Sequence, residues 1–80
     1  MSKEPTHLSV RNRLPGRITA IKQDGIMAQV ELQVGDNHIV AVVTAEAVAD
    51  LGLAVGMEAV ALIKSTSVMI LTREGGLAGL

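Results

Sequence analysis

The 80-residue sequence contains no cysteine, phenylalanine, tyrosine or tryptophan. Without cysteine the protein can form no disulfide, no thiolate metal site and no thiol nucleophile. Its two histidines, His7 and His38, are too few to build a structural zinc site by themselves. Without aromatic rings the protein also lacks the side chains on which single-stranded nucleic acids usually stack their bases.

Charge and the length of the apolar stretches exclude further classes. Lys and Arg number 7 and Asp and Glu 8, which gives a formal net charge of −1, whereas a free-standing nucleic-acid-binding domain is usually basic. The longest apolar stretches, such as residues 39–43, are far too short to cross a membrane. The N-terminal segment MSKEPTHLSV lacks the apolar core of a signal peptide. We therefore expect a cytoplasmic protein with neither a nucleic-acid nor a membrane partner.

The chain is small for a domain that folds alone. A chain of this length buries about 62% of its unfolded surface, close to the lower limit for a lone domain. The aromatic side chains, which bury the largest areas, are missing. Burial and chain entropy nearly cancel in such a chain. Assembly of several copies is therefore the expected source of additional stability.

Hydrophobic patterning in the first half of the chain predicts short strands. Residues 8–14 and 17–22 are each predicted to form a strand, separated by the turn signal Pro15-Gly16. Residues 28–34 are apolar at every second position, which predicts a strand with one buried face. Residues 39–43 are continuously apolar, which predicts a strand covered on both faces.

The second half predicts one helix and two more strands. Thr44 can cap a helix of about two turns over residues 45–51, and Gly52 can end it. Residues 58–63 and 68–72 are the two strands, joined by a polar segment.

These elements together predict an all-β fold with one short helix, a small OB-type β-barrel of five or six short strands. The predicted domain covers residues 8–72. Residues 1–7 are expected to form a flexible N-terminus, and residues 73–80, with three glycines, a flexible C-terminal tail.

No pattern of catalytic residues is present in the sequence. His7 lies in the polar N-terminal segment and His38 follows a predicted hairpin turn, so the two do not form a pair. The carboxylates are spread singly, without the close pairing that acid–base hydrolysis requires. A phosphate-binding loop is also missing. We therefore expect a protein that is not an enzyme and has no metal site and no catalytic cofactor.

Two clusters of hydrogen-bond donors stand out. The first is Ser9-Val10-Arg11-Asn12, and the second is Lys64-Ser65-Thr66-Ser67. They offer hydroxyl, guanidinium, amide and ammonium donors together with backbone N–H groups, and turns with adjacent N–H groups can bind anions. Such clusters suit a small, fully ionised oxyanion. Each is also compatible with an ordinary solvated turn, which is the commoner case.

Three segments of the chain resemble the molbindin (Mop) family, the small molybdate-binding form of the TOBE domain. They are SVRNRLPGRITAI (9–21), VVTAEAVADLGLAVG (42–56) and ALIKSTSVMIL (61–71). Their order and spacing match the family pattern from about residue 8 to residue 71. Val10 stands where the family usually has Ala, and Ala47 where it usually has Ser.

The resemblance implies an OB-type barrel that assembles into homotrimers or homohexamers and binds an oxyanion at the subunit interfaces. It implies a cytoplasmic protein that binds molybdate or tungstate as its ligand and stores or buffers it. Carried over position by position, the ligand-binding residues are Ser9, Arg11, Asn12, Lys64, Ser65 and Thr66.

Three alternatives remain open. The domain could serve as a non-enzymatic oligomerisation or regulatory interaction module with no dedicated anion site. Nucleic-acid binding through an OB-type face would require a steep dependence of affinity on salt. Binding of a molybdenum-pterin cofactor would lack an aromatic side chain to stack on the pterin.

Overall fold

The computed structural model describes residues 10–79 and divides the chain into two compact units. One unit comprises residues 14–61, and the other combines the residues up to 13 with those from 62 onward. The boundaries fall within strands β1 (Asn12–Asp24) and β4 (Glu58–Ile63). No helix among residues 10–79 is long and apolar enough to span a membrane.

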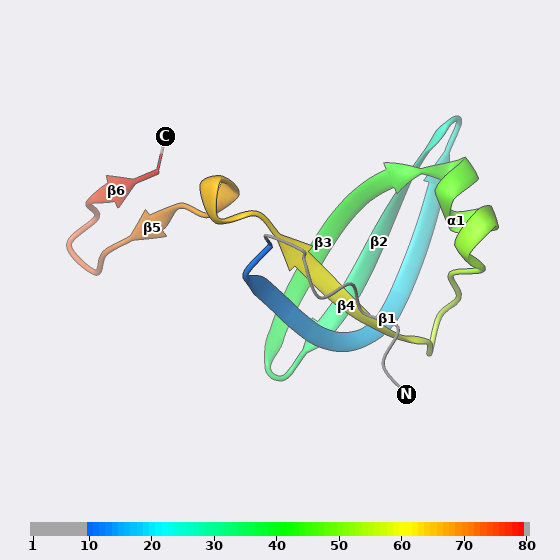
Figure 1. Ribbon diagram of the computed structural model, residues 1–80, viewed down its shortest axis with the longest axis horizontal. Helices are drawn as coiled ribbons and strands as arrows, with labels where there is room; N and C mark the ends of the chain where they lie inside the picture. Colours follow the sequence, from blue (N-terminus) through cyan, green and yellow to red (C-terminus); the bar gives the residue numbers. More distant parts are fainter. Residues whose placement is uncertain (1–9, 80) are drawn as a thin grey trace. The chain divides into compact units, whose positions relative to one another are not determined.

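The larger unit is built on an antiparallel sheet. Strands β2 (Met27–Val34) and β3 (Asn37–Thr44) follow β1 through two-residue turns, and the strand order is β3-β2-β1-β4. Gly25 and Gly35 occupy the first position of each turn with φ of 64° and 57°, a conformation that glycine adopts without strain. The sheet curls along β1, β2 and β3 into half of a barrel (Figure 1). The predicted all-β fold with one short helix is confirmed.

The prediction of two separate strands before residue 24 is wrong, because β1 runs continuously through Pro15-Gly16. The register between β1 and β2 begins with Arg17 opposite Gln33, so Pro15, which has no N–H to donate, precedes the paired residues. At Gly16 the two backbones approach so closely that a Cβ atom would lie 2.5 Å from the Gln33 carbonyl oxygen. Gly16 therefore permits a close strand contact here instead of ending the strand.

The core lies on one face of β1 and β2. The alternation predicted for residues 28–34 is confirmed, because Ala28, Val30 and Leu32 are 2–5% exposed. Ile18 on β1 is 1% exposed, and Val48 of the helix is the fifth buried apolar residue among residues 10–79. All five are aliphatic and small or medium in size, so this core buries little area for a domain.

Strand β3 departs from the prediction for residues 39–43. Its side chains alternate between half-buried and exposed, and Val40 and Val42 are 51% and 63% exposed. Because β3 is the last strand of its sheet and only one of its faces packs on the core, the prediction of a strand covered on both faces is wrong for the single chain.

The helix α1 (Ala45–Leu51) confirms its prediction at both ends. The Oγ1 of Thr44 accepts a hydrogen bond from the Ala47 N–H at 3.0 Å, which satisfies one of the unpaired donors at the helix N-terminus. Gly52 ends the helix in the left-handed region at φ 65°, and the Leu53 N–H donates to the Val48 carbonyl at 3.0 Å.

The smaller unit contains the C-terminal elements. After β4 come the 3₁₀ turn η1 (Ser65–Ser67) and the strands β5 (Ile70–Leu71) and β6 (Leu77–Ala78), which pair with each other. The strand predicted over residues 68–72 is thus limited to two residues, and its partner lies in the predicted tail. The domain bounds at residues 8 and 72 remain predictions.

Candidate functional site

The first donor cluster precedes and begins strand β1. Ser9 lies outside the described residues. Arg11 is exposed and directly precedes the strand, and Asn12 is half-buried as its first residue. The Asn12 Nδ2 atom donates a hydrogen bond of 2.9 Å to the carbonyl oxygen of Ile63. Since Ile63 is the last residue of β4, this bond joins the first donor cluster to the residue just before the second.

The second donor cluster forms the turn η1. Lys64 is the residue that precedes the turn, with φ −61° and ψ 142°, and its side chain makes no capping bond. The turn is closed by the Ser67 N–H, which donates to the Lys64 carbonyl at 2.9 Å. All four side chains of the segment 64–67 are exposed. Their hydroxyl and ammonium donors therefore face solvent, where a small anion has access to them.

A hollow of about 240 Å³ brings parts of the two clusters together. Val10, Lys64, Ser65 and Thr66 line it, and we call it the Lys64 hollow. None of these described lining residues carries a carboxylate. Four oxygen atoms packed like liquid water occupy about 120 Å³, so the hollow can hold a tetrahedral oxyanion. The hydroxyls of Ser65 and Thr66 and the ammonium group of Lys64 can donate hydrogen bonds to such an anion, and none of these three side chains is negatively charged.

A larger hollow of about 660 Å³ lies in the unit of residues 14–61, beside Arg17, Thr19, Gln33 and Glu58. There the Arg17 Nη2 atom is 4.0 Å from the Glu58 Oε2 atom. The positive charge is therefore balanced by a carboxylate, which disfavours an anion. The smaller Lys64 hollow has the more suitable chemistry for an oxyanion.

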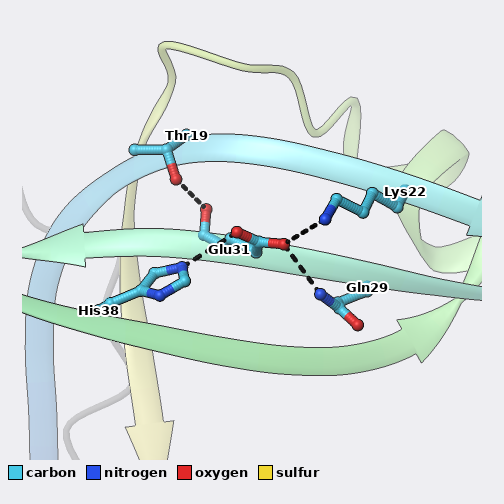
Figure 2. Close-up of polar contacts among 5 residues, drawn as sticks. All are labelled: Thr19, Lys22, Gln29, Glu31 and His38. Carbon is cyan, nitrogen blue, oxygen red and sulfur yellow. Dashed lines mark hydrogen bonds and ion pairs between the residues drawn. The ribbon is translucent and has the colours of Figure 1, made fainter.

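A third polar cluster, which is not apparent from the sequence, surrounds Glu31 (Figure 2). Its Oε2 atom accepts a hydrogen bond of 2.8 Å from Gln29 Nε2 and lies 3.2 Å from Lys22 Nζ. Its Oε1 atom lies 3.0 Å from His38 Nε2, and Thr19 Oγ1 donates to its backbone carbonyl at 3.2 Å. We call these five residues the Glu31 network.

The Glu31 network draws its members from β1, β2 and β3. The hydrogen bond from Gln29, and then that from Lys22, hold the pKa of the Glu31 carboxyl below its ordinary value. With both oxygens engaged, the carboxylate is a structural group rather than a base. The alternation of residues 28–34 placed Gln29 and Glu31 on the polar face, but only the register of the three strands brings Lys22 and His38 to Glu31.

The described residues 10–79 contain no group of three or more metal-ligating side chains.

The family model of the TOBE domain matches residues 8–70. The chain belongs to the TOBE-domain family. The matched stretch includes both donor clusters and the Glu31 network, whereas β6 lies beyond its end.

Individual TOBE-domain relatives are similar over nearly their whole length. Molybdenum-pterin-binding protein 1 of Clostridium pasteurianum is 42% identical over 65 residues, which cover 80% of this chain and 96% of that protein. The solved structure of a molybdate-binding protein from Sporomusa ovata has a TM-score of 0.80 at 31% identity, covering 84% of this chain and 100% of that one.

A third relative has been solved with molybdate bound. This is the cytoplasmic molybdate-binding protein ModG, with a TM-score of 0.73 at 40% identity, covering 76% of this chain and 44% of that one. Together these likenesses confirm the resemblance to the Mop form of the TOBE domain and the OB-type fold.

Proposed function

We propose that this TOBE-domain protein binds molybdate, or tungstate, which has the same charge and shape, and stores or buffers it in the cytoplasm without catalysing a reaction. One observation carries the proposal. The bond between Asn12 and Ile63 brings the two donor clusters together beside a hollow whose described lining residues carry no carboxylate, in a chain similar to proteins described as molybdate-binding.

The energetics are adequate without a large basic surface. A hydrogen bond to a charged group contributes about 1.5–3 kcal/mol. Four to six such bonds supply the roughly 8 kcal/mol that a micromolar site requires. A dianion can therefore be held by hydroxyls, backbone N–H groups and one or two cations, and the net charge of −1 is no obstacle.

The complete site is proposed to lie between subunits of a homotrimer or homohexamer. The proposed donors are Ser9, Arg11, Asn12, Lys64, Ser65 and Thr66. Among the donors that the structure describes, Lys64, Ser65 and Thr66 line the Lys64 hollow of the single chain. A second copy is proposed to add the donors of the first cluster. Exposed apolar side chains support assembly, since Val42 is 63% and Leu71 is 71% exposed.

The test is isothermal titration of molybdate into the purified protein, with sulfate as the control anion and sedimentation to establish the assembly. We expect saturable binding of molybdate, weaker binding of sulfate, and fewer than one anion per chain, because symmetry-related copies share each site. A folded, assembled sample that releases no heat with molybdate beyond the sulfate control would contradict the proposal.

The substitution Lys64→Ala separates this function from a pure interaction module. Removal of the ammonium group should weaken molybdate binding at least tenfold and leave the assembly intact. Arg17→Ala is the matched control, because it also removes one positive charge but lies at the larger hollow, paired with Glu58. Unchanged affinity in Lys64→Ala would remove Lys64 from the site, and assembly without any anion binding would favour the interaction module.

A further inference from the structure

The hydrogen bond between Asn12 and Ile63 connects residues 51 positions apart. Its acceptor is the main-chain carbonyl immediately before Lys64, and its donor is the side-chain amide of a half-buried residue. We propose that Asn12 is a positioning residue, which holds the turn η1 in the conformation that binds the anion and acts through Lys64, Ser65 and Thr66. This inference rests on the proposed function.

The chemistry of the amide favours this role over that of a main ligand. An asparagine side chain has one amide nitrogen with two N–H donors and one oxygen that only accepts. One of its two N–H donors is engaged with the Ile63 carbonyl at 2.9 Å, which leaves at most one for a ligand. The oxygen would repel a dianion, so the amide gains more from fixing the backbone than from facing the ligand.

Few hydrogen bonds within the described chain hold the turn in place. It comprises three exposed residues, and its hydrogen bonds are the 2.9 Å bond from the Ser67 N–H to Lys64 and a long 3.4 Å contact from the Val68 N–H to Ser65. Short 3₁₀ turns have poorer hydrogen-bond geometry than α-helices. An external bond at the residue before Lys64 therefore restricts the direction in which the chain enters the turn.

The affinity for the anion depends on the fraction of the protein in which the turn η1 has the binding conformation. If the turn samples other conformations, the apparent affinity falls in proportion to the fraction that is competent to bind. Loss of the Asn12 bond should thus weaken molybdate binding even though Lys64, Ser65 and Thr66, the donors that line the Lys64 hollow, are all kept. It should also loosen the turn in the protein without any ligand.

The experiment measures both quantities in the full-length protein. Amide hydrogen exchange of Ser67, followed by NMR without ligand, reports the turn, and calorimetry with molybdate reports affinity. For Asn12→Ala we expect exchange about tenfold faster at Ser67 and affinity about tenfold weaker, with an unchanged number of sites. Saturating molybdate should restore most of the protection, because the anion selects the ordered turn.

Two matched variants give the contrast. Lys64→Ala should weaken binding but leave Ser67 exchange at the wild-type rate, since it removes a donor without releasing the turn. Asn37→Ala, at an exposed position at the start of β3, should change neither quantity. If Asn12→Ala does not fold, Asn12→Gln keeps an amide one methylene further out and should give intermediate values of both.

Each contrary result has a distinct meaning. Wild-type exchange at Ser67 in Asn12→Ala would overturn the positioning role, and weaker binding alongside it would make Asn12 a direct ligand. Absence of molybdate binding by the wild-type protein would instead overturn the proposed function. The exchange measurement would still decide whether Asn12 orders the turn.

Discussion

Glu31 illustrates how a single residue can be surrounded by donors on an otherwise open sheet. Its side chain is 14% exposed, and Lys22 and His38 from the neighbouring strands reach its two oxygens. Because the partners stabilise the ionised form, the pKa of this carboxyl lies below its ordinary value. The Glu31 network therefore ties β1, β2 and β3 together on the face of the sheet opposite the core.

The lowered pKa of Glu31 predicts a pH dependence of stability. A carboxyl with a lowered folded pKa stabilises the native state above its unfolded pKa, and this contribution is lost as the pH falls through the folded pKa. The free energy of unfolding should therefore decrease toward acid, and Glu31→Gln should lack this part of the decrease. Denaturant unfolding followed by far-UV circular dichroism, with the exposed Glu74→Gln as control, measures both. Identical pH profiles for wild type and Glu31→Gln would contradict the prediction.

The close contact at Gly16 predicts that one added methyl group lowers the free energy of unfolding. A Cβ there would lie 2.5 Å from the Gln33 carbonyl oxygen and 2.8 Å from Val34 Cγ2. Gly16→Ala should lower the free energy of unfolding by about 1–3 kcal/mol, because β1 and β2 must separate. Gly35→Ala is the control, since nothing lies within 4 Å of its Cβ and only its positive φ opposes alanine. A smaller loss of unfolding free energy in Gly16→Ala than in Gly35→Ala would contradict the prediction, because β1 and β2 would then have moved apart to make room for the methyl group.

At the scale of elements, the stability of α1 depends on its two capped ends and on one buried side chain. Val48 is 9% exposed and is the only helix residue in the core cluster of the described chain. A seven-residue helix is too short to be stable by itself. Its caps at Thr44 and Gly52 therefore contribute a large share of its stability.

Removal of the N-terminal cap tests that dependence. Thr44→Ala deletes the oxygen that accepts from the Ala47 N–H and should cost about 1 kcal/mol of unfolding free energy. Thr44→Ser retains a hydroxyl and should lose much less. Thermal unfolding followed by circular dichroism at 222 nm compares the three proteins, and equal losses in both variants would place the effect in the lost methyl group instead.

At the scale of the molecule, the core is small and much apolar surface is uncovered. Five residues form the buried cluster of the described chain, while Val40, Ile70 and Leu71 are 51%, 62% and 71% exposed. An isolated subunit with this distribution gains little from burial. The surface of other copies can cover these side chains and add to the stability of each subunit.

Assembly of this kind predicts a midpoint of thermal unfolding that depends on protein concentration. Linked assembly raises the apparent stability as subunit concentration increases, so the midpoint should rise over a hundredfold range of concentration. Molybdate at about 100 times its dissociation constant should add about 2.7 kcal/mol. Differential scanning calorimetry measures both, with sulfate as the control anion. A midpoint independent of concentration would indicate a monomer or an assembly that stays intact during unfolding.

Local features of the sequence determined the elements whose stability arises within a few residues. The alternation of residues 28–34 predicted the buried face of β2, because side chains on a strand alternate between two faces. Thr44 and Gly52 predicted both ends of α1 through bonds that span three to five residues. The residues of the two donor clusters were also recognisable, because their chemistry depends on residue type.

Only the tertiary structure decided the features that depend on register and on which strand lies at the edge. The sequence could not place Asn12 against Ile63, because these residues are 51 positions apart and meet only when β1 and β4 lie side by side. Nor could it show that Gly16 serves a close strand contact, or that Val42 lies on an uncovered face. Periodicity assigns a side chain to one of two faces, whereas the pairing of distant strands determines what that face meets.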